Sequence, residues 1–252
     1  CRWKTLKDTI DIAVLYLNEP LLPHQSIKIT TPFYVKIPSA KFSRLGHLGN
    51  AYYITQWYPK PAVYDHYGWH PMPYLHNGEF FSEYGHYDVS ITLPKNYVLA
   101  ATGNRIADDE EEQFLNHRIR LTQRLIANAK DTVLSNNFPE SSKEYKTVRF
   151  VESNVHDFAW FADKRFLVLK DEIELFESKK KVNTWLYFTP KNIDLWKKAL
   201  EYINEATLFY SYFVGDYPYN NVSAVDGSTA AGGGMEYPTI TLINQSSTDR
   251  QL

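Results

Sequence analysis

Cysteine, a charge excess and long apolar runs are almost absent from this 252-residue sequence. The single cysteine, Cys1, excludes an internal disulfide and a Cys-x-x-Cys metal site. Lys plus Arg number 27 and Asp plus Glu number 29, so no basic surplus could neutralise phosphates and we expect no nucleic-acid partner. Apolar stretches such as 158–162 are far too short for a membrane span, and no apolar stretch near the start indicates a signal peptide. The sequence does not indicate the cellular compartment of the protein.

The sequence also lacks the short motifs of several enzyme classes. It contains no Gly-x-Ser-x-Gly turn and no glycine-rich phosphate loop that ends in Lys-Ser or Lys-Thr. His66 and His70 have the spacing of paired zinc ligands, but no Glu follows His66, and Pro71 follows His70 directly. A zinc-bound water needs that glutamate as its base, so we predict no zinc site at this pair. We assign the histidines at 76, 86 and 156 to loops or strands.

The composition is globular and rich in aromatic residues. Apolar residues make up 44%, charged residues 22% and aromatic residues 15%, with 19 Tyr and 6 Trp. Tyr and Trp are typical of half-buried β surfaces, although a surface on which sugars or peptides stack is the alternative interpretation. We favour the β interpretation. It predicts packing roles for Tyr52, Tyr53, Trp57, Tyr58, Trp160 and Trp185.

The first half of the chain has the pattern of a β domain. Apolar and polar residues alternate over 26–37, which predicts a strand, and Pro32 within it predicts an edge position or a bulge. Four prolines between 57 and 77 predict an irregular loop. Further strands are expected over 11–17, 51–56, 87–93, 98–102, 147–151, 157–162, 166–169 and 182–188.

Two stretches have helical periodicity. In the first, over 108–128, five consecutive acids precede the apolar positions and basic residues follow, an order that suits the helix dipole. We interpret it as a helix inserted into the β domain. The second begins at Thr189 and Pro190, a pair typical of a helix start, and ends at Gly215. Short strands are expected after it, over 222–225 and 239–243, and an exposed hairpin end is expected at the three lysines 179–181.

A glycine run followed by an acid lies between those two short strands. Glycines occupy 232–234, and Met235 and Glu236 follow. Consecutive glycines are favoured where a positive φ or the close approach of another chain is required. A carboxylate beside such a run could stand at the rim of a cleft and bind an ammonium group, while an extended ligand pairs with the strand. A flexible loop with a solvated glutamate explains the motif equally well.

The segment Gly-Gly-Met-Glu-Tyr at 233–237 resembles the Gly-x-Met-Glu-Asn exopeptidase motif of the aminopeptidase N-like gluzincins, a family of zinc metallopeptidases. Tyr237 stands where the family has Asn. The resemblance extends through nearly the whole chain in family order. It includes a Gln-containing segment at 55–65, strands at 85–94 and 100–103 with an Ala-Thr-Gly turn, an Asp-Phe-Ala strand at 155–160, and a helix end with a Pro turn at 213–219.

The resemblance implies substrate-binding roles for five residues. Glu236 corresponds to the acid that binds the free α-amine of a peptide, and Gln56 to the residue that assists it. Gly233, Gly234 and Met235 correspond to the strand edge along the peptide backbone. One carboxylate cannot satisfy all three donors of an ammonium group, so we expect Glu236 and Gln56 on one wall of the same cleft.

The resemblance also implies where the catalytic machinery lies. In this family the His-Glu-x-x-His helix follows the exopeptidase motif, whereas the 16 residues after Glu236 contain no histidine. We therefore expect a fragment of a zinc-dependent aminopeptidase. The full-length parent would use zinc to hydrolyse peptides with a free N-terminus. The 252-residue chain alone would be inactive, with no zinc and no catalytic residue.

The expected fold is mainly β with some α. Residues 1–189 should form most of an N-terminal β domain, a saddle or sandwich of mostly antiparallel strands with the helical insertion at 109–130. Residues 190–252 should begin a thermolysin-like catalytic domain. Two alternatives stay open. One is a non-catalytic relative that acts as a binding or scaffold protein, and the other is a carbohydrate-binding β module with an exposed row of Tyr and Trp on one sheet face.

Overall fold

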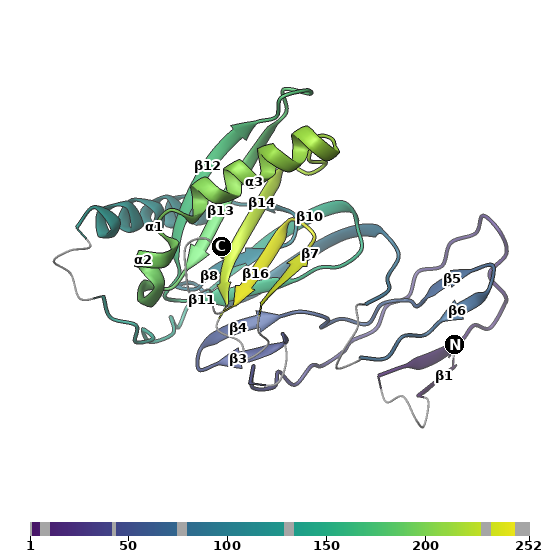
Figure 1. Cartoon of the computed structure of the whole chain (residues 1–252). Coiled ribbons are helices and arrows are strands. Elements are labelled where there is room, and N and C mark those ends of the chain that lie inside the picture. The colour runs from purple at the N-terminus through teal and green to yellow at the C-terminus, as the bar shows by residue number, and fades with distance from the viewer. Residues whose placement is uncertain are drawn as a thin grey trace. The chain divides into compact units, whose positions relative to one another are not determined.

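The structure, a computed structural model, describes residues 2–5, 11–41, 44–74, 80–128, 134–227 and 233–244. The chain divides into two compact units. Unit 1 consists of residues 1–36 and 58–84, and unit 2 consists of residues 37–57 and 85–252. The expected fold class is confirmed, because mostly antiparallel sheets predominate and helices form the smaller part (Figure 1).

Unit 1 is built from short antiparallel strand pairs. Strand β1 (Arg2–Thr5) pairs with β2 (Ala13–Tyr16), and β5 (Val63–Asp65) pairs with β6 (Gly68–His70). The prediction of an irregular loop over 57–77 is therefore wrong for 63–70. Gly68 has a φ of +106°, and this left-handed conformation lets the chain reverse between β5 and β6 over two residues.

The predicted strand at 26–37 is wrong, because residues 25–38 have no regular secondary structure. A strand needs partners for its backbone N–H and C=O groups, and Pro32 removes one of the donors. Ile29 and Phe33, which the alternation places on a buried face, are 59% and 50% exposed. Alternation without a partner strand and without burial does not form a strand.

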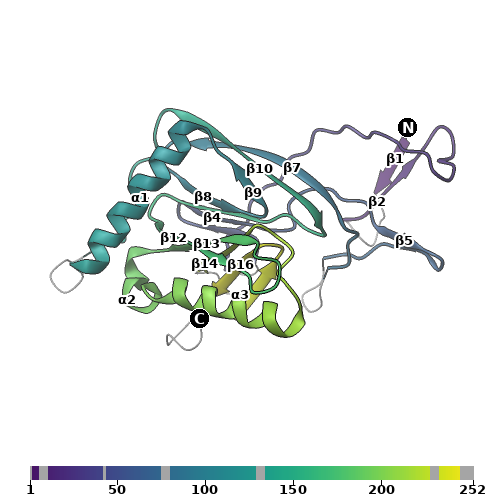
Figure 2. The same cartoon turned by 90° about the horizontal axis from the view of Figure 1, so that it is seen from above.

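The described part of unit 2 contains three sheets (Figures 1 and 2). Two of them are fully antiparallel and confirm the strands predicted between 51 and 162, the last of which begins only at Trp160. The first sheet has the order β3 (Gly46–Leu48), β4 (Ala51–Ile54), β11 (Trp160–Asp163), β8 (Val98–Ala101). The second has the order β7 (Gly85–Pro94), β10 (Tyr145–Val155), β9 (Asn104–Ile106).

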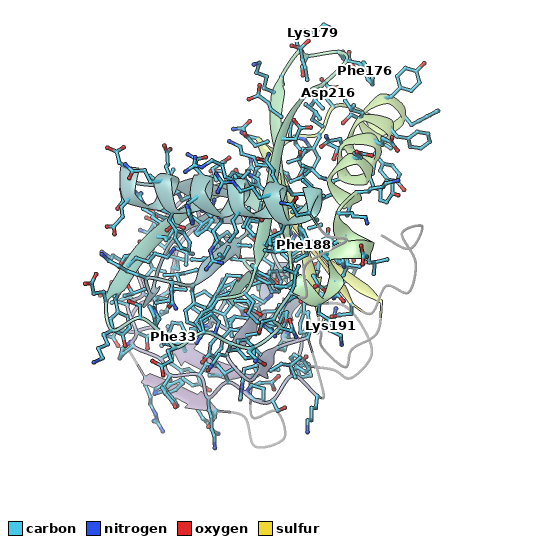
Figure 3. All side chains as sticks on the ribbon, turned by 90° about the vertical axis from the view of Figure 1, so that its left-hand side faces the viewer. Phe33, Phe176, Lys179, Phe188, Lys191 and Asp216 are labelled. Carbon is cyan, nitrogen blue, oxygen red and sulfur yellow. The ribbon has the colours of Figure 1, made fainter. Side chains whose placement is uncertain are left out.

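The third sheet is mixed and contains the predicted motif. Its order is β12 (Leu167–Glu174), β13 (Lys181–Phe188), β14 (Asn221–Gly227), β16 (Ile240–Asn244), β15 (Gly234–Tyr237). Strands β12 and β13 form a hairpin whose far end carries Lys179, as predicted (Figure 3). Strand β14 runs parallel to β13 and to β16, whereas β15 runs antiparallel to β16. Strand β15 is therefore a short edge strand.

The predicted inserted helix is present as α1 (Asp109–Ala127). The Asp108 carboxylate caps its start by accepting a hydrogen bond from the backbone N–H of Glu111 at 2.9 Å. Helix α1 packs against β12, where the Thr122 hydroxyl accepts a hydrogen bond from the backbone N–H of Val168 at 2.9 Å. The helix thus covers a backbone donor of this edge strand, which would otherwise be buried without a partner.

The second predicted helix is divided into three pieces, η1 (Pro190–Asn192), α2 (Ile193–Trp196) and α3 (Ala199–Val214). Pro190 occupies the first turn as predicted, and Gly215 follows α3 with a φ of +118°. Helix α3 packs across β12, β13 and β14 (Figures 1 and 2). None of the described helices is both long and apolar enough to cross a membrane.

The main core of unit 2 lies between the first and third sheets. Phe161 of β11 is at its centre, with ring centroids 6.2 Å from Tyr53 of β4 and 6.3 Å from Tyr237 of β15. A second core, which includes Phe188 and Trp196, lies beneath α2 and α3. Of the six aromatic residues predicted to pack, Tyr53 is buried and the other five are half-buried, so their packing role is confirmed.

The predicted domain boundary at residue 189 falls inside unit 2. Strand β13 ends at Phe188 and pairs with β14 over residues 183–187, so one sheet continues across the boundary. Strands β12 and β13 therefore share a sheet with the motif strand β15 rather than with the strands that precede them. The division at residue 189 stays a prediction, because the boundaries between the two compact units fall at other positions in the chain.

Candidate functional site

Four of the five predicted substrate-binding residues lie on β15 or directly before it. Gly233 has a φ of +76°, and apart from its chain neighbours no described residue lies within 4 Å of the place a Cβ would occupy, so its backbone conformation is the reason for glycine. Its carbonyl accepts a hydrogen bond from the backbone N–H of Asn244 at 2.7 Å, which extends the β15–β16 ladder. Gly232 lies outside the described residues.

Successive residues of β15 face opposite sides of the sheet. Met235 and Tyr237 pack on the main core. Glu236 consequently faces the other side, directly opposite Thr241 of β16. Its side chain is exposed and makes no hydrogen bond or ion pair with any residue that the structure describes. The edge strand therefore presents a carboxylate that no described residue binds.

A cavity of ≈ 550 Å³ opens on the same side of the sheet, between α3 and strands β14 and β16. Its walls are largely apolar and include Ile203 and Ala206 of α3, Ala224 of β14 and Thr241 of β16. Because Thr241 is the cross-strand neighbour of Glu236, the carboxylate lies beside the rim of this cavity.

Gln56 follows β4 and has a φ of +52°. Its side-chain nitrogen donates a hydrogen bond to the carboxylate of Asp157, which is 3% exposed. The next residue, Trp57, donates its indole N–H to the carbonyl of Phe158 at 3.0 Å. Two side-chain contacts therefore hold 56–57 against 157–158 and set the orientation of the Gln56 amide.

Among the described residues, the segment of Gln56 and β15 both contribute aromatic rings to the main core. Tyr53 of β4 and Tyr237 of β15 both pack on Phe161. No hydrogen bond joins Gln56 to Glu236 within the described residues. That the two side chains share one wall of a cleft stays a prediction.

Histidines and acids do not gather into a metal centre in the described ranges, where no group of three or more His, Cys, Asp or Glu could hold an ion. His70 binds Asp65 instead, with Nε2 and Oδ1 2.8 Å apart, and this hydrogen bond lowers the pKa of the Asp65 carboxyl. His86 binds the Ser153 hydroxyl at 2.8 Å. His76 lies outside the described residues.

Unit 1 carries several exposed aromatic side chains. Trp3 and Tyr16 are exposed on β1 and β2, and Tyr64 and Trp69 are exposed on β5 and β6 with ring centroids 4.8 Å apart. The two strand pairs form separate two-stranded sheets. The described part of unit 1 therefore has no continuous aromatic row on one sheet face, the feature that the carbohydrate-binding alternative predicts.

A second cavity, of ≈ 290 Å³, which no sequence motif indicates, lies on the opposite face of the third sheet. Two cationic residues line it, Arg105 of β9 and Lys170 of β12, together with Trp185 of β13. The lining residues come from strands and a helix that are distant in the sequence, and no short motif links them. These residues lie together because of how the sheets pair and pack, which a local sequence pattern does not indicate.

Comparisons with known proteins give a distant structural neighbour. No model of a protein family and no curated protein sequence matches the chain. Among solved structures, the crystal structure of Legionella pneumophila aminopeptidase A in complex with aspartic acid is similar, with 14% sequence identity and a TM-score of 0.42. The similarity covers 64% of this chain and 16% of that chain.

Proposed function

We propose that this chain supplies the part of a zinc-dependent aminopeptidase, of the aminopeptidase N-like gluzincin type, that binds the free amino terminus of a peptide. The observation that carries the proposal is the position of Glu236. It is an exposed carboxylate without a partner among the described residues, on an edge strand beside an apolar cavity. Such a group can accept charge-assisted hydrogen bonds from an α-ammonium group.

Strand β15 offers a backbone edge for the rest of the substrate. An edge strand has N–H and C=O groups on one side that are not used by its own sheet, and an extended peptide can pair with them as an added strand. Gly234 has no side chain that could obstruct a peptide. Met235 packs on the core, and its sulfur accepts a hydrogen bond from the Arg44 guanidinium. The peptide would lie along these residues with its amine at Glu236.

Gln56 is proposed to complete the recognition of the amine. An ammonium group has three donors, and a carboxylate alone leaves at least one of them without a good acceptor. The Gln56 side-chain nitrogen donates its hydrogen bond to the Asp157 carboxylate. The amide oxygen is therefore the atom that would accept a hydrogen bond from the amine of a ligand. Asp157 would then act as a positioning residue that the motif did not reveal.

Binding of a charged amine at a fixed place would restrict hydrolysis to the first peptide bond. An internal peptide segment has no ammonium group, so it would leave Glu236 beside the cavity without a partner. The resemblance implies a zinc ion as cofactor of the whole enzyme, but the described residues contain no group that could hold one. We therefore derive no catalytic step from this chain and propose that it binds and positions the substrate.

The test uses the whole protein that contains this chain, with hydrolysis of an aminoacyl p-nitroanilide and zinc content as the two measurements. Glu236→Ala should lower kcat/KM by about 100-fold or more, because the ammonium loses its charged acceptor, and zinc content should not change. Glu205→Ala removes another exposed glutamate, on α3, and should keep normal activity.

Near-normal activity of Glu236→Ala would contradict the proposal, as would a loss of activity that follows a loss of zinc. The 252-residue chain alone should hydrolyse no substrate, and chelator-sensitive hydrolysis by it would equally count against the proposed division of roles. If the whole protein carries no His-Glu-x-x-His sequence, the alternative of a non-catalytic binding or scaffold protein replaces the enzyme.

A further inference from the structure

The second cavity contains an arginine that is held in place but has no carboxylate partner among the described residues. The Nη2 of Arg105 donates to the backbone carbonyl of Leu99 at 2.7 Å and to the Tyr187 hydroxyl at 3.0 Å. The guanidinium carbon lies 5.3 Å from the ring centroid of Phe150 and 5.1 Å from that of Trp185. Arg105 makes no ion pair with any described residue. Its orientation is therefore fixed by neutral groups alone.

A second cation faces the same space. The Lys170 ammonium lies 4.9 Å from the Trp185 ring centroid and has no ion pair within the described part of the chain. The one acid in the described part of the lining, Glu112 of α1, is exposed. The nearby buried acid Glu111 is already paired with Lys146, with Nζ and Oε2 2.5 Å apart. Among the described lining residues, two cations, Arg105 and Lys170, therefore stand against one carboxylate, Glu112.

The rest of the polar lining can bind uncharged groups. Asn221 is 7% exposed, and its side-chain nitrogen donates to the carbonyl of Gly103 at 3.1 Å, while its Oδ1 has no partner among the described residues. A buried acceptor without a donor is unfavourable, so a ligand N–H or O–H that reached it would gain a hydrogen bond. The lining also includes the uncharged polar side chains of Asn104, Asn116, Asn183 and Ser223.

We propose that this cavity binds a small organic anion, with Arg105 and Lys170 at its carboxylate or phosphate group and the Asn side chains at its uncharged polar groups. A half-buried guanidinium loses hydration and regains interaction energy when an oxyanion pairs with it. A volume of ≈ 290 Å³ is at the small end for ligand sites, which favours a compact ligand. This site lies on the opposite face of the third sheet from Glu236 and does not depend on the proposed function.

The experiment is isothermal titration calorimetry of the 252-residue chain with two probes, inorganic phosphate and succinate, at constant ionic strength. We expect saturable one-to-one binding of at least one probe with a Kd of about 1 mM or tighter. Binding of phosphate alone identifies a phosphate ligand, and binding of succinate alone identifies a carboxylate ligand. Succinamide, which has the same carbon chain without charge, should not bind.

Variants locate the binding in the cavity. Arg105→Gln should weaken the affinity about tenfold or more, and Lys170→Gln should weaken it several-fold. Arg120→Gln, on the exposed side of α1 and outside the cavity, is the matched control and should bind as the unchanged chain does. Because Lys170 is exposed, its variant keeps the test valid if Arg105→Gln fails to fold. Absence of saturable binding by both probes, or equal binding by the Lys170→Gln and unchanged chains, would overturn the proposal.

Discussion

The ring of Tyr237 lies 6.3 Å from the ring of Phe161, so the residue directly after Glu236 belongs to the main core. Tyr237 is only 5% exposed, and it fixes the end of the short edge strand β15. Because neighbouring residues of a strand face opposite sides, the burial of Tyr237 turns Glu236 away from the core. The place of the candidate carboxylate thus follows from the packing of its neighbour.

Tyr237→Asn introduces the residue that the resembling motif has at this position. The change replaces a buried ring by a short polar side chain, so it leaves a void and buries an amide. We expect the free energy of unfolding to fall by about 2–4 kcal/mol, measured by urea denaturation. Tyr237→Phe, which keeps the ring, should lower it much less. Equal stability of Tyr237→Asn and the unchanged chain would show that the core does not hold β15.

The Ala-Thr-Gly turn after β8 is a second place where the backbone requires a particular residue. Gly103 has a φ of +86°, and an added Cβ would lie 2.8 Å from the backbone oxygen of Val151. Gly215 also has a positive φ, of +118°, but in the described ranges no atom beyond its chain neighbours lies within 4 Å of the place a Cβ would occupy. Gly103→Ala therefore combines backbone strain with a steric clash, whereas Gly215→Ala has the strain alone.

The expected stability losses differ accordingly. Gly215→Ala should lower the free energy of unfolding by about 1 kcal/mol, and Gly103→Ala by about 2–4 kcal/mol, because the β8 turn must shift away from β10. Urea denaturation of both variants measures the difference. If Gly103→Ala is no less stable than Gly215→Ala, the close approach of Gly103 to Val151 is not a constraint on the fold.

The ion pair between Glu111 and Lys146 is buried, with side chains 5% and 12% exposed. Burial lowers the pKa of Lys146, although the charge of Glu111 opposes this shift. Lys146→Met leaves the Glu111 carboxylate buried without its cation, and we expect a loss of about 3–5 kcal/mol in the free energy of unfolding. A double variant, Glu111→Leu with Lys146→Met, should regain most of that loss. If the two single variants and the double variant show additive losses, the pair has no coupling energy.

The elements that the sequence predicts correctly are those with local signals. Helix α1 begins at a capping residue, Asp108, and has acids in its first turn. Strands β7, β10 and β13 have alternating or continuous apolar patterns and find partners. The segment 26–37 has the same alternation but stays irregular, because a strand also needs a neighbour, and no local pattern shows whether one is present.

The same distinction applies to the candidate site. The resemblance of 233–237 implies a strand edge at these residues, and β15, which carries Glu236, lies at the edge of its sheet. The contact of Gln56 with Asp157 joins residues 101 positions apart, and no spacing rule predicts it. The cavity of Arg105 depends on the approach of β9 to β13 and β14. Both features form where segments that are distant in the sequence pair with one another. Such pairing depends on the whole fold, so no local pattern in the sequence indicates it.

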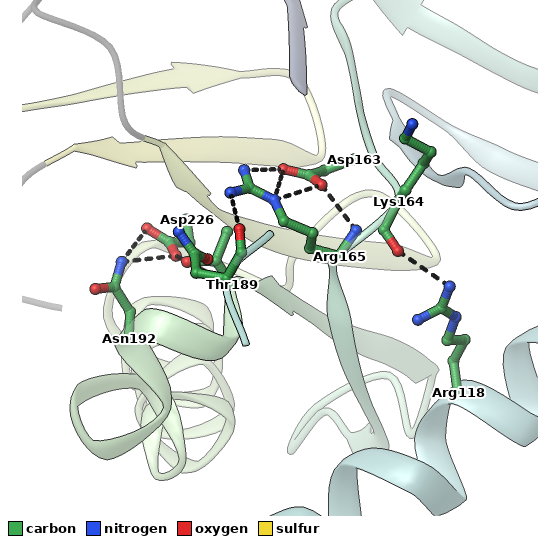
Figure 4. A network of polar contacts seen from close by, with 8 residues as sticks. Arg118, Asp163, Lys164, Arg165, Thr189, Asn192 and Asp226 are labelled. Carbon is green, nitrogen blue, oxygen red and sulfur yellow. Dashed lines mark hydrogen bonds and ion pairs between the residues drawn. The ribbon is translucent and has the colours of Figure 1, made fainter. Parts of the chain in front are cut away.

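Asp226, near the end of β14, is a buried residue that is only 2% exposed. It accepts hydrogen bonds from the backbone N–H of Thr189 at 3.0 Å, from the Thr189 hydroxyl at 2.7 Å and from the Asn192 side-chain nitrogen at 2.8 Å (Figure 4). Burial raises the pKa of Asp226 above its ordinary value of 3.8, despite these hydrogen bonds. The folded chain therefore binds this proton more tightly than the unfolded chain does.

The sign of the pH dependence follows from that shift. A carboxyl group with a raised pKa in the folded state contributes its full stabilisation below 3.8, and this contribution is lost as the pH rises through the folded-state pKa. Asp226→Asn does not titrate and keeps one acceptor oxygen for Thr189. The stability of the unchanged chain relative to Asp226→Asn should therefore fall as the pH rises from about 3.5 to about 7.5, as measured by urea denaturation at several pH values. The neighbouring ion pair of Arg165 and Asp163, with Nη2 and Oδ2 2.6 Å apart, is common to both proteins and largely cancels in the difference. A difference that is constant or rises with pH would show that the hydrogen bonds from Thr189 and Asn192 outweigh burial.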